Sequence, residues 1–83
     1  MSLYYDPSTR ILALINTNEN VKLNHADFFA YQIVNAKSGV LIGKGNLNGD
    51  GGILSLGELP VGVYIVNVQV DDSTMLTEKI VIQ

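Results

Sequence analysis

The stretch 46–52, NLNGDGG, is the part of the sequence that comes nearest to a metal-binding motif. Asn46, Asn48 and Asp50 occupy positions 1, 3 and 5 of a calcium loop of the EF-hand type. Position 12, which should be a bidentate glutamate, is a glycine, and Glu58 comes one residue too late. Only one of the first three ligands is charged. We therefore predict a glycine-rich hairpin turn over residues 45–52 and no metal site, with calcium binding as the alternative.

No other set of residues has the composition of a catalytic or zinc site. His25 is the only histidine and the chain has no cysteine, which excludes disulfides and thiolate metal sites. The G-x-S-x-G turn that carries many nucleophilic serines is missing. The eight carboxylates fall mostly in predicted turns, and so short a chain leaves little room for the cleft of a glycosidase. We predict that the protein is not an enzyme, with no catalytic residues and no cofactor.

Composition and charge limit the partners that the chain can bind. Its 83 residues suffice for one domain, and 47% hydrophobic content can form a core without disulfides or metal. The net charge is −3 and the five Lys and Arg residues are scattered, which argues against nucleic acid and anionic membranes as partners. The sequence has neither a membrane-spanning run nor the pattern of a signal peptide. We interpret residues 1–3 as a cloning remnant and residues 4–83 as a single domain cut from a longer parent.

Short runs of branched and apolar residues alternate with turn residues along the chain. The clearest run is Val63–Val70, where Tyr64, Val66 and Val68 fall on one face of a strand. The predicted strands cover residues 9–15, 21–23, 28–35, 40–44, 53–59, 63–70 and 75–83. Because turns recur roughly every 8–12 residues, we predict an all-β, immunoglobulin-like antiparallel β-sandwich of about seven strands.

The residues before the clearest strand have a local structural interpretation. Pro60 ends the preceding run because it lacks an N–H group and fixes its φ angle. Gly62 gives the chain backbone freedom at the corner. Tyr64 is expected on the inward face, where its hydroxyl needs a hydrogen-bond partner.

Two segments near the end of the chain resemble a known family. Residues 59–68, LPVGVYIVNV, resemble the LPxGxYIVxV signature of the C-terminal sorting domains of the type IX (Por) secretion system of Bacteroidetes. Residues 78–83, EKIVIQ, resemble the closing KKIVIQ strand of that family. Upstream, Tyr31–Asn35 with Gly39 is similar to its VxIYDxxGxxV hairpin. Residues 5–12, YDPSTRIL, stand where the family has YPNPxxDxL, without its first proline.

The resemblance implies a non-catalytic sorting domain fused to an upstream cargo domain. Such domains are recognised by secretion machinery at the outer membrane and removed by a sortase-like peptidase. The cargo then passes from the periplasm to the cell surface or the medium. A last strand also tends to be an edge strand, open to pairing with another protein or to a weak edge-strand dimer. The predicted recognition residues are Pro60, Gly62, Tyr64, Lys79, Ile80, Val81, Ile82 and Gln83.

The altered front segment leaves an alternative open. The chain could be a small secreted β-sandwich module that binds a protein or a glycan. Tyr4 and Tyr5 precede the first predicted core strand and would be exposed for such contacts. The chain has no tryptophan, which weakens the glycan alternative.

Overall fold

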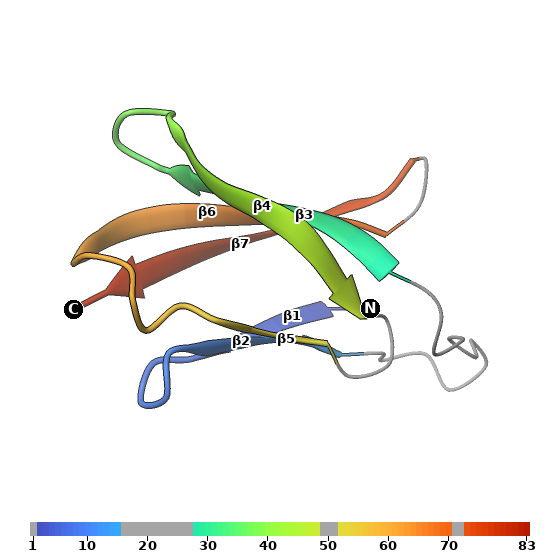
Figure 1. Cartoon of the computed structure of the whole chain (residues 1–83), viewed down its shortest axis with the longest axis horizontal. Coiled ribbons are helices and arrows are strands. Elements are labelled where there is room, and N and C mark those ends of the chain that lie inside the picture. Colours follow the sequence, from blue (N-terminus) through green and yellow to red (C-terminus); the bar gives the residue numbers. More distant parts are fainter. Residues whose placement is uncertain (1, 16–27, 49–51, 71–72) are drawn as a thin grey trace.

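Two antiparallel sheets lie face to face in the computed structural model (Figure 1), which describes residues 2–15, 28–48, 52–70 and 73–83. The smaller sheet has the order β1-β2-β5 and the larger sheet the order β4-β3-β6-β7. The strands are β1 Ser2–Asp6, β2 Ile11–Ile15, β3 Phe28–Asn35, β4 Leu41–Asn48, β5 Ile53–Ser55, β6 Gly62–Gln69 and β7 Met75–Ile82. The prediction of an immunoglobulin-like β-sandwich of seven strands is therefore confirmed.

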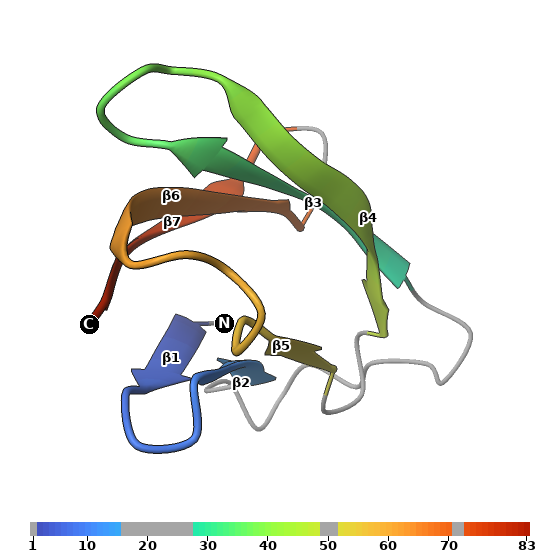
Figure 2. The same ribbon diagram turned by 60° about the vertical axis from the view of Figure 1, so that its left-hand side comes forward.

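The connections between the sheets explain why the fold is a sandwich. β5 pairs with β2 although β3 and β4 lie between them in the sequence, so the chain changes sheet after β2, after β4 and again after β5. The two sheets form separate layers, which Figure 2 shows from a second direction. Each layer presents one apolar face to the other, as aligned sandwiches do.

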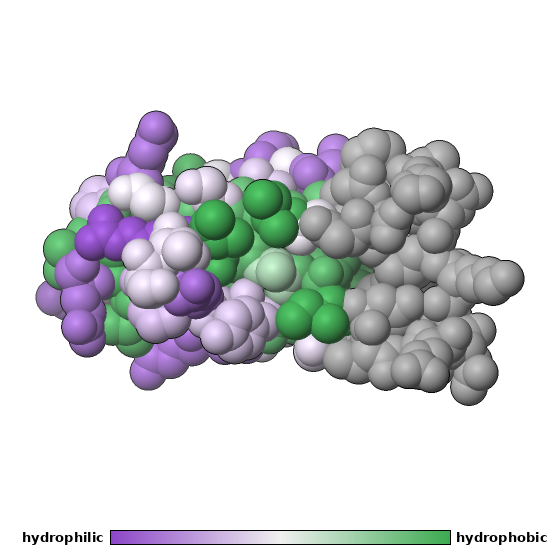
Figure 3. Space-filling model, turned by 90° about the horizontal axis from the view of Figure 1, so that it is seen from below, coloured by the Kyte–Doolittle hydropathy of each residue, from purple (hydrophilic) through white to green (hydrophobic). Residues whose placement is uncertain are grey.

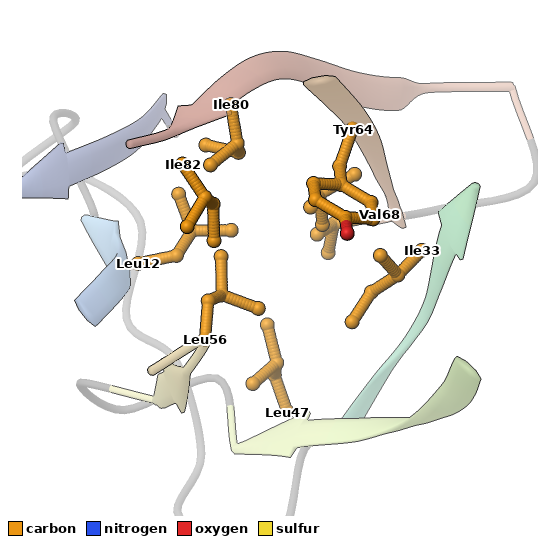
Figure 4. Close-up of a cluster of buried hydrophobic side chains, with 9 residues drawn as sticks. Leu12, Ile33, Leu47, Leu56, Tyr64, Val68, Ile80 and Ile82 are labelled. Atoms are coloured by element: carbon orange, nitrogen blue, oxygen red, sulfur yellow. The ribbon is translucent and has the colours of Figure 1, made fainter. Parts of the chain in front are cut away.

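The core between the sheets comes from strict alternation along the strands. In β6, Tyr64, Val66 and Val68 are 3%, 0% and 0% exposed, and their neighbours in the strand are only partly buried. Leu12 and Leu56 face them from the smaller sheet and its following turn (Figure 4). The predicted inward face of this strand is thereby confirmed.

The first strand was not predicted from the sequence. Leu3 and Tyr5 of β1 pack against the core, while Tyr4 between them is exposed. Ser2 and Leu3, which the sequence analysis sets aside with Met1, pair with β2. The sequence pattern of this strand is weak, because only two of its five residues face the core and one of these is a tyrosine.

The middle of the chain departs from the prediction at two strands. The predicted loop over residues 45–52 is wrong at its start, because β4 continues to Asn48 and buries Leu47 in the core. The prediction of a hairpin turn there is also wrong, since β4 and β5 belong to different sheets. β5 is only three residues long and ends at Ser55, where the prediction continues to residue 59, and a turn follows. The predicted strand over residues 21–23 lies outside the described residues.

Of the two glycines in β4, Gly45 lies closer to a neighbouring side chain. A Cβ atom there would stand 2.8 Å from the hydroxyl oxygen of Tyr31 and 2.9 Å from its Cε1 atom. A Cβ atom at Gly43, on the same strand, would stand 4.0 Å from Cδ1 of Ile33. We expect Gly45→Ala to lower the free energy of unfolding by about 1–3 kcal/mol, because the Tyr31 ring must move off the core. Gly43→Ala is the matched control, expected to change it by under about 0.5 kcal/mol in urea unfolding. Equal effects of the two variants would contradict this packing.

Candidate functional site

The segment that precedes β6 forms a tight corner around one tyrosine. The hydroxyl of Tyr64 donates a hydrogen bond of 2.7 Å to the carbonyl oxygen of Pro60, four residues upstream. Gly62 lies under the ring, where a Cβ atom would be 3.6 Å from it. This arrangement is the tyrosine corner of immunoglobulin-like sandwiches. Three predicted recognition residues are thus brought together, and the hydrogen bond joins two of them, Tyr64 and Pro60. The backbone freedom expected of Gly62 is not used, because its φ angle is not positive and a Cβ atom there would make only ordinary contact.

Removing the hydroxyl of Tyr64 tests the corner. We expect Tyr64→Phe to lower the free energy of unfolding by about 1 kcal/mol, because the ring stays in the core and only the hydrogen bond to Pro60 is lost. Chemical denaturation of the two proteins measures the difference. A variant as stable as the wild type would show that the hydrogen bond does not hold the corner.

The other five predicted recognition residues lie on or directly after β7, and they divide by face. Ile80 and Ile82 are 0% and 2% exposed and belong to the core. Lys79, Val81 and Gln83 are exposed on the opposite face or at the end of the strand. A partner in contact with the folded domain can therefore touch these last three side chains but not the two isoleucines.

The backbone of β7 has one paired edge and one open edge. In antiparallel pairs, hydrogen-bonded residues alternate with residues that point away from the partner. The N–H of Val70 donates to the carbonyl of Thr74, and the N–H of Ala36 donates to the carbonyl of Val63 on the other side of β6. Both bonds place the even-numbered residues of β7 toward β6. The odd-numbered residues Met75, Thr77, Lys79 and Val81 therefore turn their N–H and C=O groups outward, and β6 is the only described strand that pairs with β7.

Arg10 holds the end of this hairpin. Its Nη2 atom donates a hydrogen bond of 2.7 Å to the main-chain oxygen of Gln83, and its Nη1 atom is 3.5 Å from the carbonyl oxygen of Gly57. Arg10 has a φ angle of 58°, the left-handed region that a non-glycine residue rarely adopts. The sequence analysis did not single out this residue. Its contacts join residues 73 and 47 positions apart, which no local pattern reveals.

Two substitutions separate the side chain of Arg10 from its backbone. Both Arg10→Gly and Arg10→Ala remove the hydrogen bonds to Gln83 and Gly57. Only glycine relieves the left-handed backbone, so we expect Arg10→Gly to be more stable than Arg10→Ala by about 1 kcal/mol. Thermal unfolding of both variants measures this difference, and equal stabilities would contradict the role assigned to the φ angle.

A hollow of about 500 Å³ lies beside the end of β7, next to β1 and the turn that follows it. Its lining residues are Tyr5, Pro7, Arg10, Glu78, Val81 and Gln83. It combines apolar surface with one cation and one carboxylate. Since β1 and β7 are in contact along this side of the sandwich, the hollow adjoins the outward edge of β7.

The turn on the far side of this hollow is fixed by a carboxylate. One oxygen of Asp6 accepts hydrogen bonds from the N–H of Ser8 at 2.9 Å and from its hydroxyl at 2.8 Å. These bonds to Ser8 lower the pKa of Asp6 below its ordinary value of 3.8. Asp6 is therefore ionised at neutral pH and holds the turn that carries Arg10.

Comparison with protein-family models, with curated proteins and with solved structures finds no match to this chain. Membership of a family is therefore not shown. The structure establishes a small all-β domain of two sheets, and the resemblance to sorting domains stands on the quoted segments alone.

The calcium alternative has little support in the described part of the chain. Asn46 and Asn48 are paired residues of β4, opposite Ala30 and Phe28, so the first half of the proposed loop is extended strand. Asp50 and His25 lie outside the described residues. Within residues 2–15, 28–48, 52–70 and 73–83, no three His, Cys, Asp or Glu side chains gather as metal ligands. The same residues contain no helix long and apolar enough to cross a membrane.

The outside of the smaller sheet carries apolar side chains, which Figure 3 shows from below. Tyr4 is 59% exposed and Ile53 is 62% exposed, and both lie beside Ala13 in the register of the sheet. Tyr5, Phe29 and Tyr31 instead pack against the core. Of the two tyrosines expected to be exposed for partner contacts, Tyr4 is exposed, whereas the expectation for Tyr5 is wrong because it packs against the core.

Proposed function

We propose that this chain is a non-catalytic C-terminal sorting and interaction domain, which directs an exported cargo protein through type IX secretion to the cell surface. One observation carries the proposal. The two segments that resemble the family, residues 59–68 and 78–83, become the corner, β6 and the second half of β7, and these two strands pair along eight residues. The segments are thus one hairpin with one outward edge.

The contact with the secretion machinery follows from the edge of β7. A receptor strand that pairs with Thr77, Lys79 and Val81 would gain main-chain hydrogen bonds that β7 does not make to β6. Lys79 is the one charged side chain on the outer face of β7, and a single charge is a weak guard against strand addition. Arg10 fixes Gln83 and so holds the end of this edge in place.

A secretion assay tests the proposal. A signal peptide and a reporter protein are fused ahead of residues 1–83 and expressed in a Bacteroidetes host with a working type IX system; the reporter without the domain is the control. We expect the fusion at the cell surface or in the medium with the domain removed, and the control in the periplasm. A fusion that stays in the periplasm uncleaved would refute the sorting function. Deletion of residues 78–83 is not a suitable control, because it removes Ile80 and Ile82 from the core.

A second candidate is a secreted accessory module that binds a protein or a glycan. Exposed Tyr4 and Ile53 on the outside of the smaller sheet favour it. This candidate predicts the periplasmic outcome of the assay, with substitution of Tyr4 weakening partner capture.

A further inference from the structure

The outer face of the larger sheet is polar in one half and apolar in the other. Along β6 the outward residues are Val63, Ile65, Asn67 and Gln69, since Tyr64, Val66 and Val68 point into the core. A solvated face of an antiparallel sheet is normally polar throughout. In the polar half, the hydroxyl of Thr77 donates a hydrogen bond of 2.8 Å to the side-chain oxygen of Asn67, as such a face should.

The register extends the apolar half across all four strands. Val34 lies opposite Ile65, and Leu41 lies opposite Val34 on the other side of β3. Val81 lies opposite Val63. Leu41 and Val81 are 48% and 44% exposed.

A β-bulge adds one more residue to this surface. The register shifts between Ile33 and Val34, so that Gly43 lies opposite the first and Leu41 opposite the second. Ile42 is the extra residue, and it is 44% exposed. We call Val34, Leu41, Ile42, Val63, Ile65 and Val81 the apolar patch.

Lysines border the apolar patch on three sides. Lys79 lies opposite Ile65 at the β7 end of one row, and Lys44 lies two residues along β4 from Ile42. Lys37 lies in the turn between β3 and β4 and is exposed. These are three of the four cationic side chains in the described part of the chain. The described acids lie elsewhere: Asp6 in the β1–β2 turn, Glu58 in the turn before β6, and Glu78 in the hollow beside β7.

We infer that the apolar patch binds a short amphipathic segment of a partner protein, with an apolar stripe flanked by carboxylates. The charge pattern selects this partner, because cations surround the apolar centre on a chain whose net charge is −3. The dimensions suit a helix: four strands about 4.8 Å apart span roughly 14 Å, and a helix of about ten residues is roughly 15 Å long. The patch uses side chains of the sheet face, so it does not depend on strand addition at the edge of β7.

Two designed peptides of the same length test the inference against the whole chain labelled with ¹⁵N. Both form a helix with one leucine stripe, flanked by glutamates in the first peptide and by lysines in the second. We expect the acidic peptide to shift the amide signals of Val34, Leu41 and Ile65, and to bind on the order of tenfold more tightly than the basic peptide at low salt. The double variant Lys44→Glu, Lys79→Glu should reverse this preference. It should also fold normally, because both side chains are exposed.

Three results would overturn the inference. The peptides could bind equally well, the shifts could map to another face, or the double variant could keep the preference of the wild type. Vesicles of phosphatidylglycerol are tested beside the two peptides and the double variant. Shifts of the apolar patch with these vesicles, and none with the acidic peptide, would make it a lipid-binding surface and refute a protein partner. Export of the reporter fusion is measured separately, so this inference can fail while the sorting function holds.

Discussion

Ile80→Ala is expected to lower the free energy of unfolding by about 2–5 kcal/mol, whereas Val81→Ala should lower it by less than about 0.5 kcal/mol. The two residues are neighbours in β7, and both occur in the segment that resembles the family. Ile80 is 0% exposed and points into the core (Figure 4), while Val81 is 44% exposed on the opposite face. A domain of this size has a total stability of only about 4–12 kcal/mol. The first variant should therefore lose a large share of the stability of the domain.

Urea unfolding of the two variants beside the wild type measures this contrast. Because alanine replaces a β-branched residue in both, the difference in strand preference largely cancels. If Val81→Ala were as destabilising as Ile80→Ala, the assignment of faces in β7 would be wrong. If Val81→Ala kept its stability but lost recognition by the secretion machinery, Val81 would be a residue that contacts the machinery.

Proline substitutions along β7 should have effects that alternate from one residue to the next. Thr77→Pro removes an N–H group that points away from β6, so we expect the fold to survive with a loss of about 1 kcal/mol. Glu78→Pro removes an N–H group that donates a hydrogen bond to β6, so we expect the free energy of unfolding to fall by about 3 kcal/mol or more. Far-ultraviolet circular dichroism and thermal unfolding distinguish these outcomes.

The control for this pair is Thr77→Ala, which loses the hydrogen bond to Asn67 but keeps the N–H group. It isolates the cost of that side-chain contact. Similar destabilisation by proline at both positions would show that the two edges of β7 are equally paired. That result would contradict the open edge.

The sequence predicts those parts of the fold in which alternation is long. β3 and β6 are found within a residue of their ends. In β6, alternating burial over the length of the strand gives a clear pattern. β1 is missed because five residues are too few for periodicity to separate a strand from a turn. β5 falls inside the strand predicted over residues 53–59, but it ends at Ser55. The continuation of β4 through Gly45 and Asn46 depends on the Tyr31 ring and on pairing with β3, which glycine and asparagine do not indicate locally.

In the candidate site, too, local patterns are predictable from the sequence and contacts between distant segments are not. The inward position of Tyr64 and its need for a hydrogen-bond partner follow from local pattern, and the structure supplies Pro60 as that partner. The resemblance groups Lys79, Ile80 and Val81 as recognition residues. Burial separates the isoleucine from the other two. Arg10 and the apolar patch arise from contacts and register between distant segments, so they appear only when the sheets are assembled.

Export of the reporter fusion carrying Thr77→Pro, measured beside the Thr77→Ala fusion, tests the proposed edge contact most directly. Both variants lose the hydrogen bond to Asn67, and only proline blocks the outward edge of β7. The account predicts that Thr77→Ala is exported and cleaved like the wild type, while Thr77→Pro remains folded but uncleaved in the periplasm. Equal export of the two fusions would contradict recognition through the edge of β7.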